Sequence, residues 1–373
     1  MKILQTANDS TLEPDGAHAT LDAFAKGYLV AGHAVVRVIP GPEDGRRHHD
    51  GVEVVTVRAP RIPGTRHRMI TSGRRMRRLL DELRPDRIEV SDRLTLQAVG
   101  RWAHQHAVPT VAISHDRLDA VLATHLRSRP LARSLADFWN LRLVVSFDTI
   151  VCATDWAGEE FARVGVENLT KVRPGVDLTA FHPDRASATL RRSLTAEDQP
   201  LLVMANRLTP AKQPELAIDT VRELHRLGLP ARLVVAGTGP SRRACRRRAA
   251  DLPVRFLGHV TERARLAQLL ATADVVLAPG SAGTFGVAAL EALASGTPVV
   301  GQRNGALPEL IDAAAGAVTY GRPAAFADAV MRLLSMDEAC RRAAARAHAE
   351  RFGWRRTVDQ MLEVHRVAVP RAA

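Results

Sequence analysis

Residues 279–301, PGSAGTFGVAALEALASGTPVVG, predict the end of a strand followed by a glycine-rich turn, a helix and a second strand. The helix is expected to begin near Thr284 to Gly286 and to stop at Gly296, with Pro298 beyond it. The free N–H groups and the positive dipole end of such a helix attract an anion. The turn is therefore a candidate anion-binding loop at the carboxyl end of a buried strand.

One acid, Glu291, lies about two turns into that helix. Its neighbours in the helix are almost all alanine or leucine, so the helix is expected to be buried on nearly every side. A buried carboxylate requires a partner, and acidic residues in nucleotide folds accept hydrogen bonds from a ribose diol. The alternative is a glutamate that faces water from an alanine-rich helix.

Outward from this stretch, apolar runs alternate with amphipathic segments along the whole chain. This alternation predicts an α/β fold with two doubly wound, Rossmann-like domains and C-terminal helices. A chain of 373 residues is also too long for one ordinary core. Strands are expected at residues 2–7, 34–41, 52–57, 87–92, 109–114, 149–154, 200–207, 231–239, 254–260, 273–280, 298–303 and 316–321.

A linker between the domains is expected near residues 175–195, where proline, glycine and charge occur without sustained periodicity. We assign residues 1–180 to an N-terminal domain and residues 181–373 to a C-terminal domain. The last helix is expected to pack back on the N-terminal domain. Ligands of such sheets bind in the loops after the strands, so two facing domains are expected to bind a ligand in a cleft between them.

Three strand-end loops in the second half carry further candidates. Arg207 and Lys212 follow a strand and precede a helix, where two cations clamp a diphosphate; the alternative is a solvated pair. Gly237 opens a turn that allows close backbone approach, although a tight αβ turn alone explains it. Gly258 and Val260 form a backbone segment that suits a base edge, and an ordinary loop explains them equally well.

The first half supplies three loops of the same kind. Gly16 makes a turn, and His18 lies near the start of the helix that follows. His115 comes directly after a strand, where it would hydrogen-bond a sugar hydroxyl or stabilise developing charge; the alternative is a structural histidine. A further strand end carries Glu89, Ser91 and Asp92.

Together, MANRLTPAK, VVAGTGP, FLGHV, TFGVAALEALASGTPVV and VRPGVDLTAFHP resemble the retaining GT-B glycosyltransferases of family 4. In the first domain, IEVSDRLTLQAVGRW and VAISHDRLD are similar to the actinobacterial mannosyltransferases that build phosphatidylinositol mannosides and related glycolipids. The resemblance covers nearly the whole chain. It implies an N-terminal acceptor-binding domain, a C-terminal nucleotide-sugar-binding domain, and transfer of mannose from GDP-mannose to a glycolipid with retention of configuration.

The resemblance also implies roles for single residues. Arg207 and Lys212 match the family's diphosphate-binding pair, and His115 matches a histidine near the donor sugar. Glu291 matches the glutamate that holds the ribose. The remaining donor-binding positions are Gly16, His18, Gly237, Gly258 and Val260, together with Gly283, Thr284, Phe285 and Gly286 of the turn.

Two positions depart from the family pattern. Gly283 stands where the family has a glutamate that helps to hold the donor sugar, and His18 stands near a position that is commonly arginine. An unpaired sugar hydroxyl in a desolvated site costs about 1–3 kcal/mol, which predicts a slower or altered enzyme. A catalytically impaired nucleotide-binding homologue therefore remains an alternative.

Two other enzyme alternatives keep the same architecture. One uses another nucleotide sugar and a soluble acceptor, such as an inositol, an aminocyclitol or a natural product. The other is a non-hydrolysing sugar-nucleotide epimerase, which requires acid–base carboxylates around the sugar.

No metal is expected to be required, because the leaving diphosphate itself takes the proton of the acceptor hydroxyl. Two clusters contain residue types that can bind a metal. They are Glu159 with Glu160, and His48 and His49 with Asp50, and both are expected to be solvated surface.

The net charge of +12 comes almost entirely from arginine, a bias that a GC-rich genome explains and that also concentrates anions at the surface. Aromatic residues make up only 4% and do not interleave with the basic ones, which argues against a nucleic-acid partner. Three scattered cysteines and the lack of an apolar leader or spanning run predict a cytoplasmic protein.

The segment 58–80 holds eight arginines and no acid. Its apolar residues Met69, Ile70, Met76, Leu79 and Leu80 permit a basic amphipathic helix at an anionic membrane, on the inner face of the plasma membrane. The alternative is a helix packed on its sheet with arginine facing water. The sequence leaves the oligomeric state open.

Overall fold

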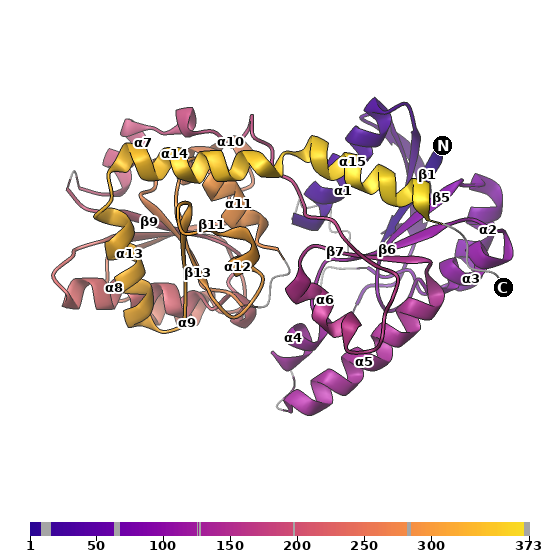
Figure 1. Cartoon of the computed structure of the whole chain (residues 1–373), viewed down its shortest axis with the longest axis horizontal. Coiled ribbons are helices and arrows are strands. Elements are labelled where there is room, and N and C mark those ends of the chain that lie inside the picture. Colours follow the sequence, from indigo (N-terminus) through magenta and orange to yellow (C-terminus); the bar gives the residue numbers. More distant parts are fainter. Residues whose placement is uncertain are drawn as a thin grey trace. The chain divides into compact units, whose positions relative to one another are not determined.

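The computed structural model describes residues 1–8, 16–62, 68–124, 126, 128–196, 198–281 and 285–368, with no side-chain description for residues 16–19. The chain forms two compact units, Met1–Pro174 with Trp354–Ala373, and Gly175–Gly353 (Figure 1). The division therefore falls at 174/175, six residues before the expected 180/181, and the C-terminal helix α15 (Trp354–Val367) belongs to the first unit. It packs against α1 (Gly16–Val30).

The first unit contains a sheet in the order β3-β4-β2-β1-β5-β6-β7-β8 over the described residues. Neighbouring strands pair in parallel, except that β3 and β4 are antiparallel. The strands are β1 (Lys2–Ala7), β2 (Ala34–Gly41), β3 (Gly45–His49), β4 (Val52–Arg58), β5 (Arg87–Ser91), β6 (Thr110–Ser114), β7 (Thr149–Cys152) and β8 (Leu169–Lys171).

Helices cover both faces of this sheet. Successive strand residues point to opposite faces, and both faces carry apolar side chains that must be buried. Leu4 joins a core that includes Met76 and Trp102, whereas its neighbour Ile3 joins a core that includes Tyr28 and Met361. The other helices of the unit are α2 (Gly73–Leu83), α3 (Gln97–Gln105), α4 (Leu118–Ala123), α5 (Arg129–Ser146) and α6 (Asp155–Ala162).

The second unit has a parallel sheet in the order β11-β10-β9-β12-β13-β14. Its strands are β9 (Leu201–Ala205), β10 (Arg232–Ala236), β11 (Val254–Gly258), β12 (Val275–Ala278), β13 (Val299–Gln302) and β14 (Gly316–Thr319). The strand order reverses between β9 and β12. In open α/β sheets, ligands bind at the carboxyl ends of the strands at this reversal.

The helical elements of the second unit separate and cover these strands. They are η1 (Pro183–Arg185), α7 (Ala188–Leu194), η2 (Pro210–Lys212), α8 (Pro214–Arg226), α9 (Arg242–Arg248), α10 (Arg263–Thr272), α11 (Val287–Ala294), α12 (Leu307–Leu310), α13 (Pro323–Leu334), α14 (Glu338–Ala349) and η3 (Glu350–Phe352).

The expected linker at 175–195 is wrong, because this segment is folded into the second unit. Phe181 is fully buried there, and the side chain of Ser187 accepts a hydrogen bond from Leu190 N to cap α7. Periodicity missed α7 because the helix is one of the shortest in the chain and buries only Leu194.

Within the residues described, no helix is both long and apolar enough to cross a membrane.

Candidate active site

The loops after β9 and β12 lie at the strand reversal of the second sheet, and they carry the predicted diphosphate site. Arg207 follows β9 and is exposed, whereas Lys212 ends η2 and is half-buried. The structure thus places both cations in the same strand-end loop.

Backbone hydrogen bonds join that loop to the end of β10, and the end of β10 to the end of β11. Leu208 N donates to Thr238 O at 2.8 Å, and Gly237 N donates to Gly258 O at 2.7 Å. A Cβ atom on Gly237 would lie 1.9 Å from Asn206 O, so only glycine permits this approach. Close packing against the backbone at Asn206 is therefore sufficient to explain why position 237 is glycine, with or without a ligand.

The loop of Lys212 also lies directly against the turn after β12. A Cβ atom on Gly280 would be 2.9 Å from Lys212 Cα, which shows how closely the two segments approach. Gln213 Nε2 donates to Ser281 Oγ at 3.2 Å, and Gln302 Nε2 donates to Gln213 Oε1 at 3.1 Å and to Pro279 O at 2.9 Å. These contacts hold Lys212 beside the predicted anion-binding turn.

The turn leads into α11 as the sequence predicts, although the helix begins at Val287. Gly286 adopts a φ of +93°, a left-handed conformation that favours glycine, and a Cβ there would also lie 2.6 Å from Leu307 Cδ2. Phe285 is buried, with its ring centroid 6.1 Å from that of Phe352. Within the described residues no side chain caps α11. Gly283 and Thr284 lie outside the described residues.

Glu291 is buried in α11, as the apolar helix predicts, and it has a partner within the protein. Its Oε1 lies 3.5 Å from Nη2 of Arg263, whose guanidinium in turn lies 5.0 Å from the ring centroid of Phe181. Burial raises the pKa of Glu291 to about 7; Arg263 opposes this rise and Asp177 adds to it. The ribose role of Glu291 remains a prediction.

We expect the raised pKa of Glu291 to make the second unit less stable as pH rises. Between the ordinary value of 4.5 and about 7, the folded state retains a proton that the unfolded state has lost. The free energy of unfolding should therefore fall through this window by about 3 kcal/mol in total and stay level above it. Urea unfolding of wild type and Glu291→Gln at about pH 5 and about pH 8 measures the difference. Identical pH dependence in the two proteins would contradict the assignment.

Gly258 and Val260, the predicted base-reading segment, lie at the end of the edge strand β11. Gly258 has a φ of +80°, and a Cβ placed there would meet nothing within 4 Å. Val260 is half-buried. Gly258 O already accepts one hydrogen bond from Gly237 N, which leaves its second lone pair and the other backbone groups of this segment for a base.

In the first unit, His115 directly follows β6 and is half-buried. Its Nε2 lies 2.9 Å from Ser91 Oγ, at the end of the neighbouring strand β5. The two strand ends therefore meet at these side chains, and Ser91 contributes to the orientation of the imidazole. Gly16 begins α1, while the His18 side chain lies outside the described residues.

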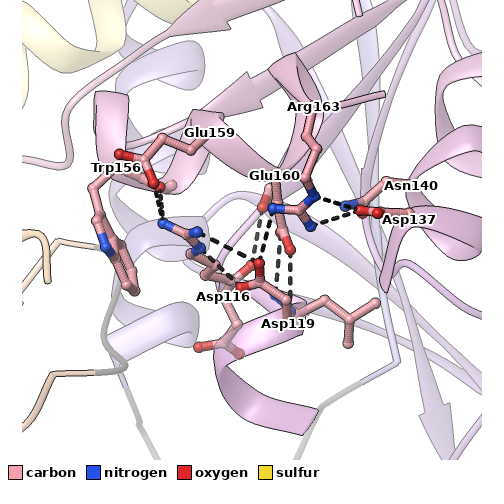
Figure 2. Close-up of polar contacts among 12 residues, drawn as sticks. Asp116, Asp119, Asp137, Asn140, Trp156, Glu159, Glu160 and Arg163 are labelled. Carbon is pink, nitrogen blue, oxygen red and sulfur yellow. Dashed lines mark hydrogen bonds and ion pairs between the residues drawn. The ribbon is translucent and has the colours of Figure 1, made fainter. Parts of the chain in front are cut away.

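A buried ion pair holds the loop that follows His115 (Figure 2). Glu160 is fully buried in α6, and its Oε1 lies 2.5 Å from Nη1 of Arg93. Glu160 also accepts from Leu118 N at 3.1 Å and Asp119 N at 3.2 Å. Arg93 further donates to Asn140 Oδ1 at 3.0 Å, to Ser114 Oγ and to Asp116 O. The expectation that Glu160 is solvated is wrong.

A second set of charged contacts continues from the same loop, as Figure 2 shows. Arg117 pairs with Asp119 at 2.8 Å and with Glu159 at 2.6 Å, and it lies over the Trp156 ring at 4.6 Å. Arg163 bridges Asp119 at 3.0 Å and Asp137 at 2.6 Å. Burial opposes ionisation of Asp119, but these two arginines outweigh it and hold its pKa below the usual value.

Glu89 is a packing group and does not lie at a strand end as expected. It is fully buried within β5, where it accepts from Tyr28 OH, from Gln5 Nε2 at 2.9 Å and from His365 Nε2 at 2.8 Å. Burial would raise its pKa, yet these hydrogen bonds bring the pKa below the usual value. Glu89 thus ties α1 and α15 to the sheet.

His48 and His49 lie on the edge strand β3, and Asp50 directly follows it. All three side chains are exposed, which confirms the prediction that they face solvent. Among the described residues, no group of three or more His, Cys, Asp or Glu side chains is arranged to hold a metal ion.

Comparisons with known proteins give each unit a match of its own. Residues 15–175 match the family described as Glycosyl transferase 4-like domain, and residues 187–350 match Glycosyl transferases group 1. The fold of the whole chain is that of sucrose-phosphate synthase from Thermosynechococcus elongatus, with a TM-score of 0.79, 18% identity and coverage of 98% of each chain.

Two relatives have names that specify an activity. A GDP-mannose-dependent alpha-(1-6)-phosphatidylinositol dimannoside mannosyltransferase from Mycobacterium tuberculosis strain H37Ra is 44% identical over 97% of this chain and 95% of its own. A D-inositol 3-phosphate glycosyltransferase from Saccharomonospora viridis is 32% identical over 72% of this chain and 66% of its own.

Two doubly wound units with a glycine-rich, cationic strand-end site define an enzyme of the GT-B glycosyltransferase class. The chain belongs to glycosyltransferase family GT4 and is similar to its actinobacterial mannosyltransferases. The resemblance seen in the sequence is therefore confirmed.

Proposed function

We propose that the protein transfers mannose from GDP-mannose to a glycolipid of the phosphatidylinositol type, with retention of configuration. The observation that carries this proposal is the 44% identity over 97% of the chain to a GDP-mannose-dependent phosphatidylinositol dimannoside mannosyltransferase. The alignment covers both units, so it includes the proposed acceptor-binding and donor-binding halves. The strand-end loop of Arg207 and Lys212 supplies the cations that a nucleotide diphosphate requires.

In this reaction the bond from the anomeric carbon to the diphosphate oxygen breaks, and a bond to the acceptor oxygen forms on the same face. The acceptor hydroxyl gives its proton to the leaving diphosphate, so no protein nucleophile is required. Arg207, Lys212 and the N–H groups at the start of α11 would stabilise the charge that grows on the diphosphate. His115 would hydrogen-bond the mannose as charge develops at its anomeric carbon.

The deciding experiment incubates the protein with radiolabelled GDP-mannose, GDP-glucose, UDP-glucose or UDP-N-acetylglucosamine and with total actinobacterial membrane lipid. We expect label from GDP-mannose alone to become organic-soluble, in a product that migrates as a phosphatidylinositol mannoside. Transfer from another donor, or label that enters only water-soluble products, would overturn the proposal. Interconversion of the free nucleotide sugar without transfer would instead indicate the epimerase alternative.

A soluble acceptor is the second candidate function, and the inositol 3-phosphate relative favours it. That relative matches only 72% of this chain at 32% identity, which is the weaker support. Adding inositol 3-phosphate, an aminocyclitol or membrane lipid in parallel separates the two acceptor classes, since each product partitions differently between water and organic solvent.

Catalytic impairment at Gly283 is tested by restoring the acid. If wild type binds GDP but transfers nothing, while Gly283→Glu transfers mannose, the natural chain is an impaired homologue. A wild type that already transfers mannose would rule out an inactive homologue.

We expect chelation to leave the rate of mannosyl transfer unchanged, because the proposed charge stabilisation uses side chains and backbone N–H groups only. Transfer is measured after dialysis against EDTA, with and without added Mg²⁺ or Mn²⁺. A loss of activity that either ion restores would show that this expectation is wrong.

The arginines of α2 are expected to strengthen binding to anionic membranes. Their helix contributes Met76 and Leu80 to the core, so its apolar face is already covered and only charge remains for a membrane. Arg74, Arg77 and Arg78 are exposed and, among described residues, have no ion-pair partner; Arg75 pairs with Asp44. Replacing all four with glutamine should weaken the binding free energy for anionic vesicles by roughly 1 kcal/mol for each arginine that lies near the membrane surface. Sedimentation with the vesicles measures this change. Binding equal to wild type at low salt would refute this role.

A further inference from the structure

Helix α5 buries one face against the first unit and exposes five large apolar side chains on the opposite face. The residues buried against the first unit are Ala132, Ala136, Asn140 and Leu143. On the opposite side lie Leu131, Leu135, Phe138, Leu141 and Val145, which we call the α5 stripe, and each is between 39% and 71% exposed. These positions recur every three or four residues, so they form one continuous ridge along the helix.

The α5 stripe is unusual for this molecule. Among the described residues, twelve large hydrophobic side chains are exposed, and five of them belong to this one helix. The stripe runs from Leu131 to Val145, so the ridge extends for about 21 Å. Scattered exposed apolar residues need no explanation, but a contiguous apolar patch marks a surface that contacts another molecule or a membrane.

Helix α5 is positively charged, and one of its arginines lies on the stripe itself. Arg129 and Arg133 lie on the same helix, are exposed, and have no ion-pair partner within the described chain. Arg142 lies within the ridge, with its guanidinium 5.6 Å from the Phe138 ring centroid, and it hydrogen-bonds Gln97 Oε1 at 3.1 Å. The helix contains one acid, Asp137, which Arg163 neutralises at 2.6 Å. Apolar side chains with an arginine among them and no unpaired acid on their helix suit an anionic bilayer, in which acyl chains lie beneath phosphate headgroups.

The helix that carries the stripe packs against α4, which follows the loop after His115, as the lower part of the first unit in Figure 1 shows. A bilayer on the stripe would therefore lie on the helix next to α4, in the same unit as the proposed acceptor-binding site.

We propose that the α5 stripe inserts into the headgroup region of an anionic phospholipid bilayer and is the apolar membrane anchor of this enzyme. The occupant is the lipid surface and not a second copy of the chain. This proposal rests on the proposed glycolipid acceptor for its purpose, but vesicle binding can be measured without any nucleotide sugar. It differs from the role given to α2, whose apolar face is buried and which contributes charge alone.

The test compares binding of the wild type and of Leu135→Ser/Phe138→Ser/Leu141→Ser to vesicles of phosphatidylglycerol with phosphatidylcholine. We expect the triple variant to bind about tenfold more weakly and to lose the part of the binding that resists high salt. Because these side chains are exposed, the melting temperature should not fall. The matched control, Val30→Ser/Leu227→Ser, removes two exposed apolar residues elsewhere and should bind as wild type does.

A fluorescent label reports insertion directly. Cys340 is the exposed cysteine, while Cys152 and Cys245 are buried, so Cys340→Ser provides a background in which Phe138→Cys is labelled selectively. A polarity-sensitive dye at position 138 should shift to shorter wavelength with anionic vesicles, whereas the same dye on Val30→Cys should not. Bound protein whose position 138 stays in water would overturn the proposal.

Two further outcomes separate this proposal from its alternatives. A dimer that the triple variant dissociates, with vesicle binding unchanged, would show that a second copy covers the stripe and would overturn the proposal. With a detergent-solubilised acceptor the triple variant should transfer mannose at the wild-type rate. If the stripe inserts but the protein transfers no mannose, only the proposed function is disproved. If the triple variant transfers mannose to a vesicle-bound acceptor as fast as wild type, only the anchor is disproved.

Discussion

Lys212→Ala lowers kcat for mannosyl transfer by about 10²–10³-fold, which is the usual cost of removing one group that stabilises charge in a transition state. Lys212 is held beside the turn after β12 by the close approach of Gly280 and by the Gln213–Ser281 hydrogen bond. An ammonium carried by a backbone held in this position would interact most strongly with a diphosphate that is gaining charge. The loss should therefore appear in kcat more than in the affinity for GDP.

The matched control for Lys212 is Lys26→Ala, since Lys26 is an exposed lysine of the first unit that pairs loosely with Asp50 at 3.7 Å. Initial rates with GDP-mannose give kcat and KM for each variant, and titration calorimetry gives the affinity for GDP. Arg207→Ala is expected to act in the same direction, with a smaller effect because Arg207 is exposed. A Lys212→Ala enzyme within about twofold of wild type would remove the diphosphate assignment.

Glu160→Ala destabilises the first unit by about 3–5 kcal/mol, the range expected when one partner of a buried ion pair is removed. The guanidinium of Arg93 would lose its carboxylate partner while its side chain is only 12% exposed. The backbone N–H groups of Leu118 and Asp119 would also lose their acceptor. Glu159→Ala is a close control. Glu159 is the preceding residue and pairs with Arg117, but its side chain is 60% exposed, so the change should cost only about 0–1 kcal/mol.

Urea unfolding gives the global change for both variants, and hydrogen exchange of peptides that cover α6 and residues 114–119 reports the first unit separately. We also expect faster exchange around His115 in the Glu160 variant, because Glu160 holds the loop that follows this residue. Equal stability of the two variants would mean that the Arg93–Glu160 pair contributes no more than a surface contact.

Most strands could be predicted because a strand that is buried on both faces is a continuous run of mainly apolar residues in the sequence. The runs at 2–7 and 34–41 coincide with β1 and β2, since parallel strands covered by helices are apolar throughout. Strand β3 could not be predicted in this way. All five of its residues are exposed, and it exists because its backbone pairs with β4, a contact without any hydrophobic pattern.

The site was partly predictable for a similar reason. Gly237, Gly286 and the cations of the β9 loop belong to short motifs whose conformations are set by neighbouring residues, and the structure places them at the ends of adjacent strands. Arg263, the partner of Glu291, was missed because it lies 28 positions away in the chain, at the start of α10. No periodicity connects two side chains that meet only through the packing of α10 on α11.

Local patterns in the chain are sufficient to predict its parallel α/β units and the glycine-rich turns at its strand ends, because turn chemistry and periodic burial act between near neighbours. The resemblance of its short motifs is sufficient to predict the glycosyltransferase family. Packing alone settles where Glu160 and Glu89 lie, as both are charged residues whose burial depends on partners supplied by distant elements. It also settles the exposure of α5. That helix is apolar on two opposite sides, so its sequence does not indicate which side faces the core until the sheet and its neighbouring helices occupy one of them.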